Sequence, residues 1–189
     1  FICITNRKLV KGDFLSWLQL ILDCGVNGLP APDWLILREK DLSEEEYFLL
    51  AKEVLGICRQ YQVSCILHTY VEAARKLGHP CIHLPLFLLE KYQGKLGDFQ
   101  ETGCSVHSVE DALKAQQLGA TYVTAGHIYT TNCKKGLPPR GLEFLREVCK
   151  VVTVPVYAIG GIHPGTDQLF QVMRNGAAGG CIMSDMMKI

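Results

Sequence analysis

The segment 126–141 gathers side chains that can bind anions and transfer protons. It opens with Gly126-His127 and carries Lys134, Lys135 and Arg140 among glycines and prolines. A histidine can both take and give a proton near neutral pH, and lysines bind phosphate as point charges. The composition favours a polar loop that covers a site for a small anionic molecule. A solvated basic loop without a chemical role is the alternative.

Two glycine pairs give a second signal for anion binding. Gly160-Gly161 follows the apolar run 156–159, and Gly179-Gly180 lies shortly before Ser184. Glycines let backbone N–H groups approach an anion closely, and a single pair is otherwise typical of a tight turn. In barrels of alternating strands and helices, the loops after the seventh and eighth strands commonly bind phosphate. Taken together, the two pairs predict a phosphate site.

Short apolar runs alternate along the chain with patterns of helical spacing. Near-continuous apolar strands that are each followed by a helix predict a parallel sheet buried on both faces. Eight repeats predict an α/β fold, the (β/α)8 TIM barrel, as a single domain over residues 1–189, with the last helix short or missing. A doubly wound open sheet is the alternative. The predicted strands are 2–5, 34–37, 63–67, 81–84, 103–106, 122–125, 154–159 and 180–183, and the predicted helices are 13–24, 43–61, 71–77, 86–92, 108–119, 141–151 and a last one from near Pro164 to Asn175.

Polar residues follow the predicted strands directly. In a barrel of this type the chemistry occurs at the carboxyl ends of the strands. We therefore predict one rim site for a polar, anionic small molecule. The strand-end residues are Asn6, Arg7, Arg38, Lys40, His68, His83, Ser105, His107, His127, Gly160, Gly161, Ser184 and Asp185.

The composition argues against nucleic acid, membranes and a metal ion as partners. Lys and Arg number 19 and Asp and Glu number 19, so the net charge is zero, which argues against a nucleic-acid binder. No apolar stretch is long enough to span a membrane, and no signal peptide is visible. The nine cysteines contain no CxxC pair and are expected to be reduced in a cytoplasmic protein. Cys65 and His68 would point to opposite faces of a strand, so no metal is expected there. A homo-oligomer is compatible with the sequence.

Several segments resemble one known family. Gly126-His127, Lys134-Lys135-Gly136 and Arg140-Gly141 resemble the thiamine phosphate synthase superfamily, and most closely its thiazole tautomerase (TenI) branch. The segments 37–40, 105–108 and 158–162 fall in the same order and spacing. The resemblance covers nearly the whole chain and implies a (β/α)8 barrel. The synthase joins a hydroxymethylpyrimidine diphosphate to a thiazole phosphate with Mg²⁺, whereas the tautomerase moves a proton to aromatise a thiazole carboxylate phosphate.

Departures from the synthase pattern favour the tautomerase. His68-Thr69 replaces an Asn-Asp pair, the segment 83–87 lacks an acid, Ile36 replaces a glutamine, and His127 stands where a proline is usual. Loss of two oxygen ligands should weaken Mg²⁺ binding severely. We therefore expect an isomerase without a cofactor, and Mg²⁺ only if the chain is a synthase.

The resemblance also implies roles for individual residues. His127 would be the acid/base group, and Thr131 and Lys134 would line the substrate pocket. Gly160, Gly161 and Ser184 would hold the phosphate of a small phosphorylated thiazole substrate. Arg38, Lys40 and Ser105 match synthase positions that contact a diphosphate.

Two alternatives stay open at this point. One is thiamine phosphate synthase itself. The other is a non-catalytic relative that binds a phosphorylated ligand, which the unusual His68 and His83 favour.

Overall fold

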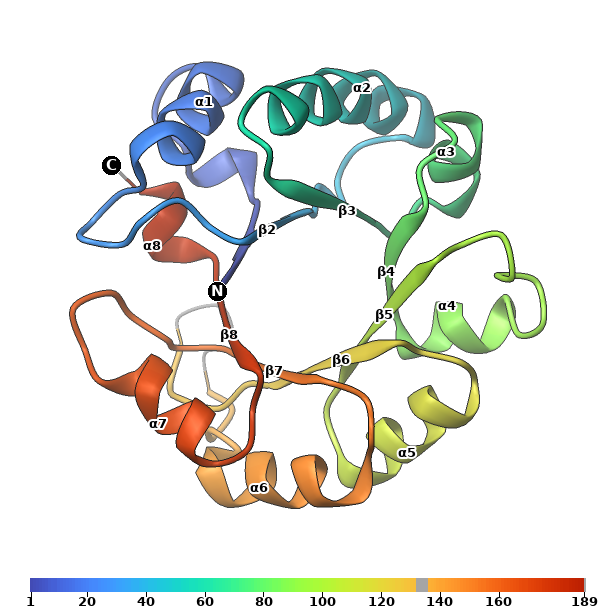
Figure 1. Cartoon of the computed structure of the whole chain (residues 1–189), viewed down its shortest axis with the longest axis vertical. Coiled ribbons are helices and arrows are strands. Elements are labelled where there is room, and N and C mark those ends of the chain that lie inside the picture. The colour runs from blue at the N-terminus through green and yellow to red at the C-terminus, as the bar shows by residue number, and fades with distance from the viewer. Residues whose placement is uncertain (132–135, 189) are drawn as a thin grey trace.

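Eight parallel strands close into a barrel in sequence order (Figure 1). The structure is a computed structural model that describes residues 1–131 and 136–188. β1 pairs with β2 on one side and with β8 on the other, which closes the sheet. The (β/α)8 prediction is confirmed and the open sheet is excluded. The strands are β1 (Ile2–Ile4), β2 (Trp34–Leu37), β3 (Ser64–His68), β4 (Cys81–Pro85), β5 (Glu101–Val106), β6 (Tyr122–Gly126), β7 (Val156–Ile159) and β8 (Gly179–Ile182).

The helices form the outer ring of the barrel (Figure 1). They are α1 (Phe14–Cys24), α2 (Glu44–Gln60), α3 (Val71–Lys76), α4 (Leu86–Lys91), α5 (Val109–Gln117), α6 (Gly141–Val151), α7 (Gln168–Arg174) and α8 (Ser184–Met187), with a 3₁₀ turn η1 (Arg7–Leu9) after β1. The last helix is four residues long, so the prediction of a short or missing final helix is confirmed. The prediction of a single domain stays a prediction.

The largest difference from the predicted bounds lies at the start of α7. The helix expected to start near Pro164 begins only at Gln168. The preceding residues form a side-chain-stabilised turn, in which the Thr166 hydroxyl donates to the His163 carbonyl over 2.8 Å and the His163 amide donates to Gln168 Oε1 over 2.8 Å. These bonds satisfy backbone groups outside the helix, so helix formation is delayed.

Local sequence signals fix the starts of the longer helices. Asp13 accepts the Ser16 amide at the start of α1. Ser43 and Glu46 form a reciprocal capping box at the start of α2, where each side chain accepts a hydrogen bond from the other's backbone amide. Three glutamates in the first turn of α2 also complement the helix dipole.

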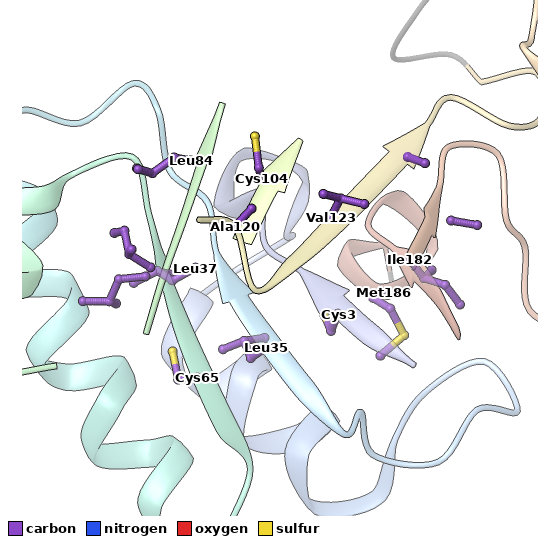
Figure 2. Close-up of a cluster of buried hydrophobic side chains, with 14 of the residues drawn as sticks. Cys3, Leu35, Leu37, Cys65, Leu84, Cys104, Ala120, Val123, Ile182 and Met186 are labelled. Carbon is purple, nitrogen blue, oxygen red and sulfur yellow. The ribbon is translucent and has the colours of Figure 1, made fainter. Parts of the chain in front are cut away.

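Side chains that alternate along each strand build two apolar layers. Ile2, Ile4 and Ile36 belong to a cluster with Tyr122 inside the barrel. Their neighbours belong to the larger cluster between strands and helices, and Figure 2 shows part of it, with Cys3, Leu35 and Leu37 among its members. Because successive residues of a strand point to opposite faces, the strand ends present alternate residues to the barrel mouth.

Two further predictions can be compared with the described residues. No helix among them is long and apolar enough to cross a membrane. Eight cysteines fall in the described ranges, all are free, and five are buried. Burial raises the pKa of Cys104 and of Cys181 to about 12, so their thiols stay protonated at neutral pH.

Candidate active site

A cavity of about 260 Å³ opens at the carboxyl ends of the strands. It lies where the barrel fold places its chemistry. Every predicted site residue within the described ranges lines it, and Lys134 lies outside those ranges. The predicted residues in the lining are Arg38, Lys40, Ser105, His127, Thr131, Gly160, Gly161 and Ser184. Residues separated by almost 150 positions in the sequence therefore meet at one mouth.

The glycine pair after β7 fits closely against the loop after β6. A Cβ atom on Gly160 would lie 2.3 Å from Cβ of His127, and one on Gly161 would lie 2.4 Å from the Thr130 carbonyl oxygen. Both glycines also have positive φ angles, which L side chains rarely adopt. The amide N–H groups of Gly160 and Gly161 donate no hydrogen bond within the described residues. They are therefore available to an anion at the mouth.

His127 is held beside this glycine pair. His127 is 8% exposed. Its backbone carbonyl oxygen accepts a hydrogen bond from the Arg140 amide over 3.0 Å. Its Nε2 lies 3.4 Å from the Leu137 carbonyl oxygen, so the returning end of the loop covers the ring. A carbonyl oxygen only accepts hydrogen bonds, so Nε2 is the donor in this contact.

Arg38 and Lys40 follow β2 and supply the positive charge of the cavity. Glu39 lies between them in the sequence but is 2% exposed and faces away from the cavity. Its carboxylate accepts the Thr5 hydroxyl over 2.7 Å and the Arg7 amide over 3.0 Å. The extended backbone turns alternate residues to opposite sides, so the carboxylate does not neutralise its two cationic neighbours in the lining.

Arg7 was also predicted at the rim, but it does not line the cavity. Its guanidinium pairs with Asp41 through two bonds of 2.7 Å and with Glu39 at 3.2 Å. It therefore has a structural role: it anchors the loop after β1 to the loop after β2.

Two stacked histidines form the floor. The His68 and His83 rings are 5.3 Å apart and nearly parallel, since the register pairs these residues across β3 and β4. Nδ1 of His83 is 2.9 Å from the Tyr122 hydroxyl, and Nε2 is 2.9 Å from Ser105 Oγ. Burial, and then the charges of Lys40 and Arg38, lower the pKa of His83 to about 3. Burial and His83 likewise lower the pKa of His68, so both rings are neutral at neutral pH.

Sequence reasoning missed two polar residues of the lining, Thr124 and His163, whereas Asp185 was predicted at the rim. Thr124 faces the cavity, 3.5 Å from His83 Nε2. The alternation of Tyr122 and Thr124 in β6 is the signal that could have found it. His163 and Asp185 also line the mouth, and Nδ1 of His163 lies 2.5 Å from the Asp185 carboxylate. Nothing local in the sequence links these two loops.

The residues at the mouth do not fit Mg²⁺. Asp185, already bound to His163, is the carboxylate among the described lining residues. No group of three or more histidine, cysteine or acidic residues in the described ranges could hold a metal ion. Mg²⁺ requires several oxygen ligands in octahedral geometry, whereas the described lining supplies one carboxylate beside imidazoles, hydroxyls and the cations Arg38 and Lys40. The prediction that no cofactor is used stays a prediction.

Known proteins are similar to this chain in sequence and in fold. The chain is 32% identical over 170 residues to a thiamine-phosphate synthase of Clostridium tetani. The aligned region covers 87% of this chain and 78% of that protein. The chain is 33% identical over 177 residues to a putative thiamine-phosphate synthase 2 of Aquifex aeolicus, covering 93% and 91%. A thiamine phosphate pyrophosphorylase from Pyrococcus furiosus superposes with a TM-score of 0.80 at 25% identity, covering 100% of this chain and 87% of that one.

These relatives correct the expected activity. They are named as thiamine-phosphate synthases, which are transferases, so the prediction of a thiazole tautomerase, an isomerase, is wrong. The tautomerase prediction was based on a few side chains that differ from the synthase pattern, such as His127 and His68. The similarity along the rest of the chain indicates the synthases instead. A few positions of the mouth can change while the barrel stays the same, so they are a weak basis for choosing a branch.

The superfamily resemblance itself is confirmed. A sequence model of the family described as thiamine monophosphate synthase matches residues 1–186. The match extends from β1 into α8, so it includes every strand that delivers a residue to the mouth. The chain belongs to the thiamine monophosphate synthase family.

Proposed function

We propose that the barrel mouth binds a phosphorylated thiazole and that the chain catalyses the thiamine-phosphate synthase reaction. The thiazole is joined to a hydroxymethylpyrimidine diphosphate. The thiazole attacks the pyrimidine methylene carbon, and the diphosphate leaves with the electron pair of its C–O bond. The convergence of cations, glycine amides and hydroxyls on one cavity, in a chain of this family, is the observation that supports the proposal.

Two groups of lining residues suit the two anionic groups of the substrates. The free amides of Gly160 and Gly161, with Ser184 nearby in the lining, would hold the thiazole phosphate. Arg38, Lys40 and Ser105 would bind the diphosphate and stabilise the charge that develops as it leaves. Fixed charges in a partly buried site stabilise such charge more than water does.

The remaining predicted residues would contact the bound rings. His127 lies beside the glycine pair, so its imidazole would contact the ligand whose phosphate those glycines hold. Thr131 lies in the same wall, and Lys134 follows it in the same loop. In this proposal His127 positions a ring and performs no proton transfer.

The partners in this proposal are small molecules alone. A cytoplasmic location agrees with the free thiols, and a zero net charge does not favour nucleic acid. A homo-oligomer is compatible with the barrel.

A pyrophosphate-release assay with both substrates tests the proposal. Arg38→Gln should lower kcat/KM by about 10–100-fold, because a charge-assisted hydrogen bond contributes about 1.5–3 kcal/mol. Arg59→Gln is the matched control, because it removes the same charge from an exposed residue of α2 that does not line the cavity. Wild-type protein that forms no thiamine phosphate with or without Mg²⁺ would contradict the proposal.

A second candidate is a protein that binds the phosphorylated ligand without turnover. The floor of neutral His68 and His83 rings, in a mouth that does not fit Mg²⁺, favours it. Calorimetric titration with thiazole phosphate separates the two candidates. Binding without pyrophosphate release under any condition supports the second candidate, and release that depends on Arg38 rejects it.

A further inference from the structure

We infer that the buried hydroxyl of Thr5 positions Arg38, because it holds the Arg38 backbone at the end of β2 and so directs the Arg38 side chain into the cavity. Thr5 is fully buried and lies outside the cavity lining, so it acts through Arg38 and not on the ligand itself. This role rests on the proposed function, in which Arg38 binds the diphosphate. Thr5 is therefore a positioning residue of the site.

The Arg38 side chain depends on its backbone for its direction. Arg38 lines the cavity, and its guanidinium makes no hydrogen bond or ion pair with any residue of the described ranges. Ordering a long side chain costs conformational entropy, so a guanidinium without such a partner is only as well placed as the backbone that carries it. Whatever holds the Arg38 backbone therefore also sets where its charge meets a ligand.

A side chain, rather than the β-ladder, holds the Arg38 backbone. The register between β1 and β2 ends at Ile4 and Ile36, and the Thr5 amide adds one more backbone bond, to the Ile36 carbonyl oxygen over 3.0 Å. The Arg38 amide then donates to Thr5 Oγ1 over 2.9 Å. This bond fixes the residue at which the chain leaves the barrel, and so the point from which the Arg38 side chain enters the cavity.

The Glu39 carboxylate decides which way the Thr5 hydroxyl points. Thr5 Oγ1 donates to Glu39 Oε1 over 2.7 Å. An ionised carboxylate only accepts hydrogen bonds, so the single hydroxyl proton points to Glu39 and the oxygen lone pairs are left for the Arg38 amide. The amide and the guanidinium of Arg7 also donate to this carboxylate, over 3.0 and 3.2 Å. A buried carboxylate is stable only with such partners, so they lock the direction of the hydroxyl.

A double-mutant cycle separates positioning from a merely structural role. Inorganic pyrophosphate is titrated calorimetrically into the full chain carrying Thr5→Val, Arg38→Gln or both. Valine keeps the shape of threonine and removes the hydroxyl. Thr5→Val alone should weaken pyrophosphate binding about fivefold or more, but less than about twofold when Arg38 is already glutamine, because Thr5 acts through that side chain. Equal fold-changes in the two backgrounds are expected of a structural role and would overturn the inference.

Two control variants test whether the hydroxyl itself is responsible. Thr5→Ser keeps the hydroxyl and should bind pyrophosphate within about twofold of wild type. Thr102→Val makes the same change as Thr5→Val at another buried strand residue outside the cavity lining, and should also leave the affinity within about twofold. A loss in either control as large as that in Thr5→Val would overturn the inference.

Amide hydrogen exchange in the wild-type protein gives a reading that needs no variant. The Arg38 amide should exchange about a hundredfold or more slowly than in an unfolded chain, because the Thr5 hydroxyl accepts it in a buried position. Exchange at the rate of an unfolded chain would overturn the inference even if Thr5→Val fails to fold.

Turnover is measured separately, so the two proposals can fail independently. Pyrophosphate binding with the expected cycle, but with no thiamine phosphate formed from both substrates, would reject the synthase and support the role of Thr5. Condensation together with equal fold-changes in the cycle would do the reverse. Wild-type protein that does not bind pyrophosphate would overturn the role of Thr5, whereas the turnover assay alone decides the proposed function.

Discussion

Gly161 offers a sharp test of how the mouth is built, because Gly165 supplies its control four residues later. Both glycines lie in the loop after β7 and have similar left-handed φ angles, 68° and 73°. A Cβ atom on Gly161 would lie 2.4 Å from the Thr130 carbonyl oxygen, whereas one on Gly165 would meet nothing within 4 Å. The pair therefore separates backbone strain from steric conflict.

The expected costs follow from those contacts. An alanine in the left-handed region costs about 1–2 kcal/mol at either position. At Gly161 the overpacking against Thr130 adds about 1–3 kcal/mol. Gly165→Ala should therefore lower the free energy of unfolding by about 1–2 kcal/mol, and Gly161→Ala by about 2–5 kcal/mol.

The same clash should reach the ligand site. Relief requires the segment at Tyr129 and Thr130 to move, and Thr131 next to it lines the cavity. Gly161→Ala should weaken the binding of thiazole phosphate about tenfold or more, while Gly165→Ala should leave it unchanged.

Urea unfolding followed by tryptophan fluorescence, with calorimetric titration of each variant, provides both readings. Equal stability losses in the two variants, or equal affinities for thiazole phosphate, would refute the steric reasoning. Such results would mean that position 161 requires glycine only for its left-handed backbone conformation, and not for the close contact with Thr130.

Three further predictions concern the surroundings of the mouth. Tyr47→Phe should cost about 1–3 kcal/mol in urea unfolding, because the buried hydroxyl donates to Leu37 O over 2.7 Å and accepts the His68 amide over 2.8 Å. His83 has a folded pKa of about 3, below its ordinary 6.5, so between these values the unfolded chain binds a proton that the folded chain does not. Stability should therefore fall on acidification through that window by up to about 1.4 kcal/mol per pH unit, and His83→Gln should show a shallower decline; an equal slope would contradict the assignment. Ser43→Ala should cost about 0.5–2 kcal/mol through loss of the capping box, whereas Glu45→Ala, nearby in the same turn, should have little effect on the unfolding midpoint.

Local sequence signals were sufficient for the order of elements. Trp34–Leu37 and Gly141–Val151 have the predicted bounds, and Ser43 and Glu46 form the predicted cap. Apolar periodicity and caps depend on residues a few positions apart, so they can be seen without the fold. The strand-end rule then placed Arg38, Lys40 and Ser105 at one mouth, because parallel strands all end on the same side.

The errors occurred where other interactions decided the outcome. Side-chain bonds in the turn around Thr166 delayed α7, although Pro164 favours a helix start. The assignment to the tautomerase branch depended on individual residues, and the relatives of the whole chain overturned it.

By itself, then, the sequence determined the alternation of strands and helices, the barrel and the polar character of its mouth. Only the tertiary structure decided that His68 stacks on His83, that Glu39 turns away from the cations beside it, and that Gly161 touches the loop at Thr130. Each of these depends on the register between strands or on the approach of distant loops once the sheet has closed. Such contacts join residues far apart in the chain, and local periodicity does not encode them.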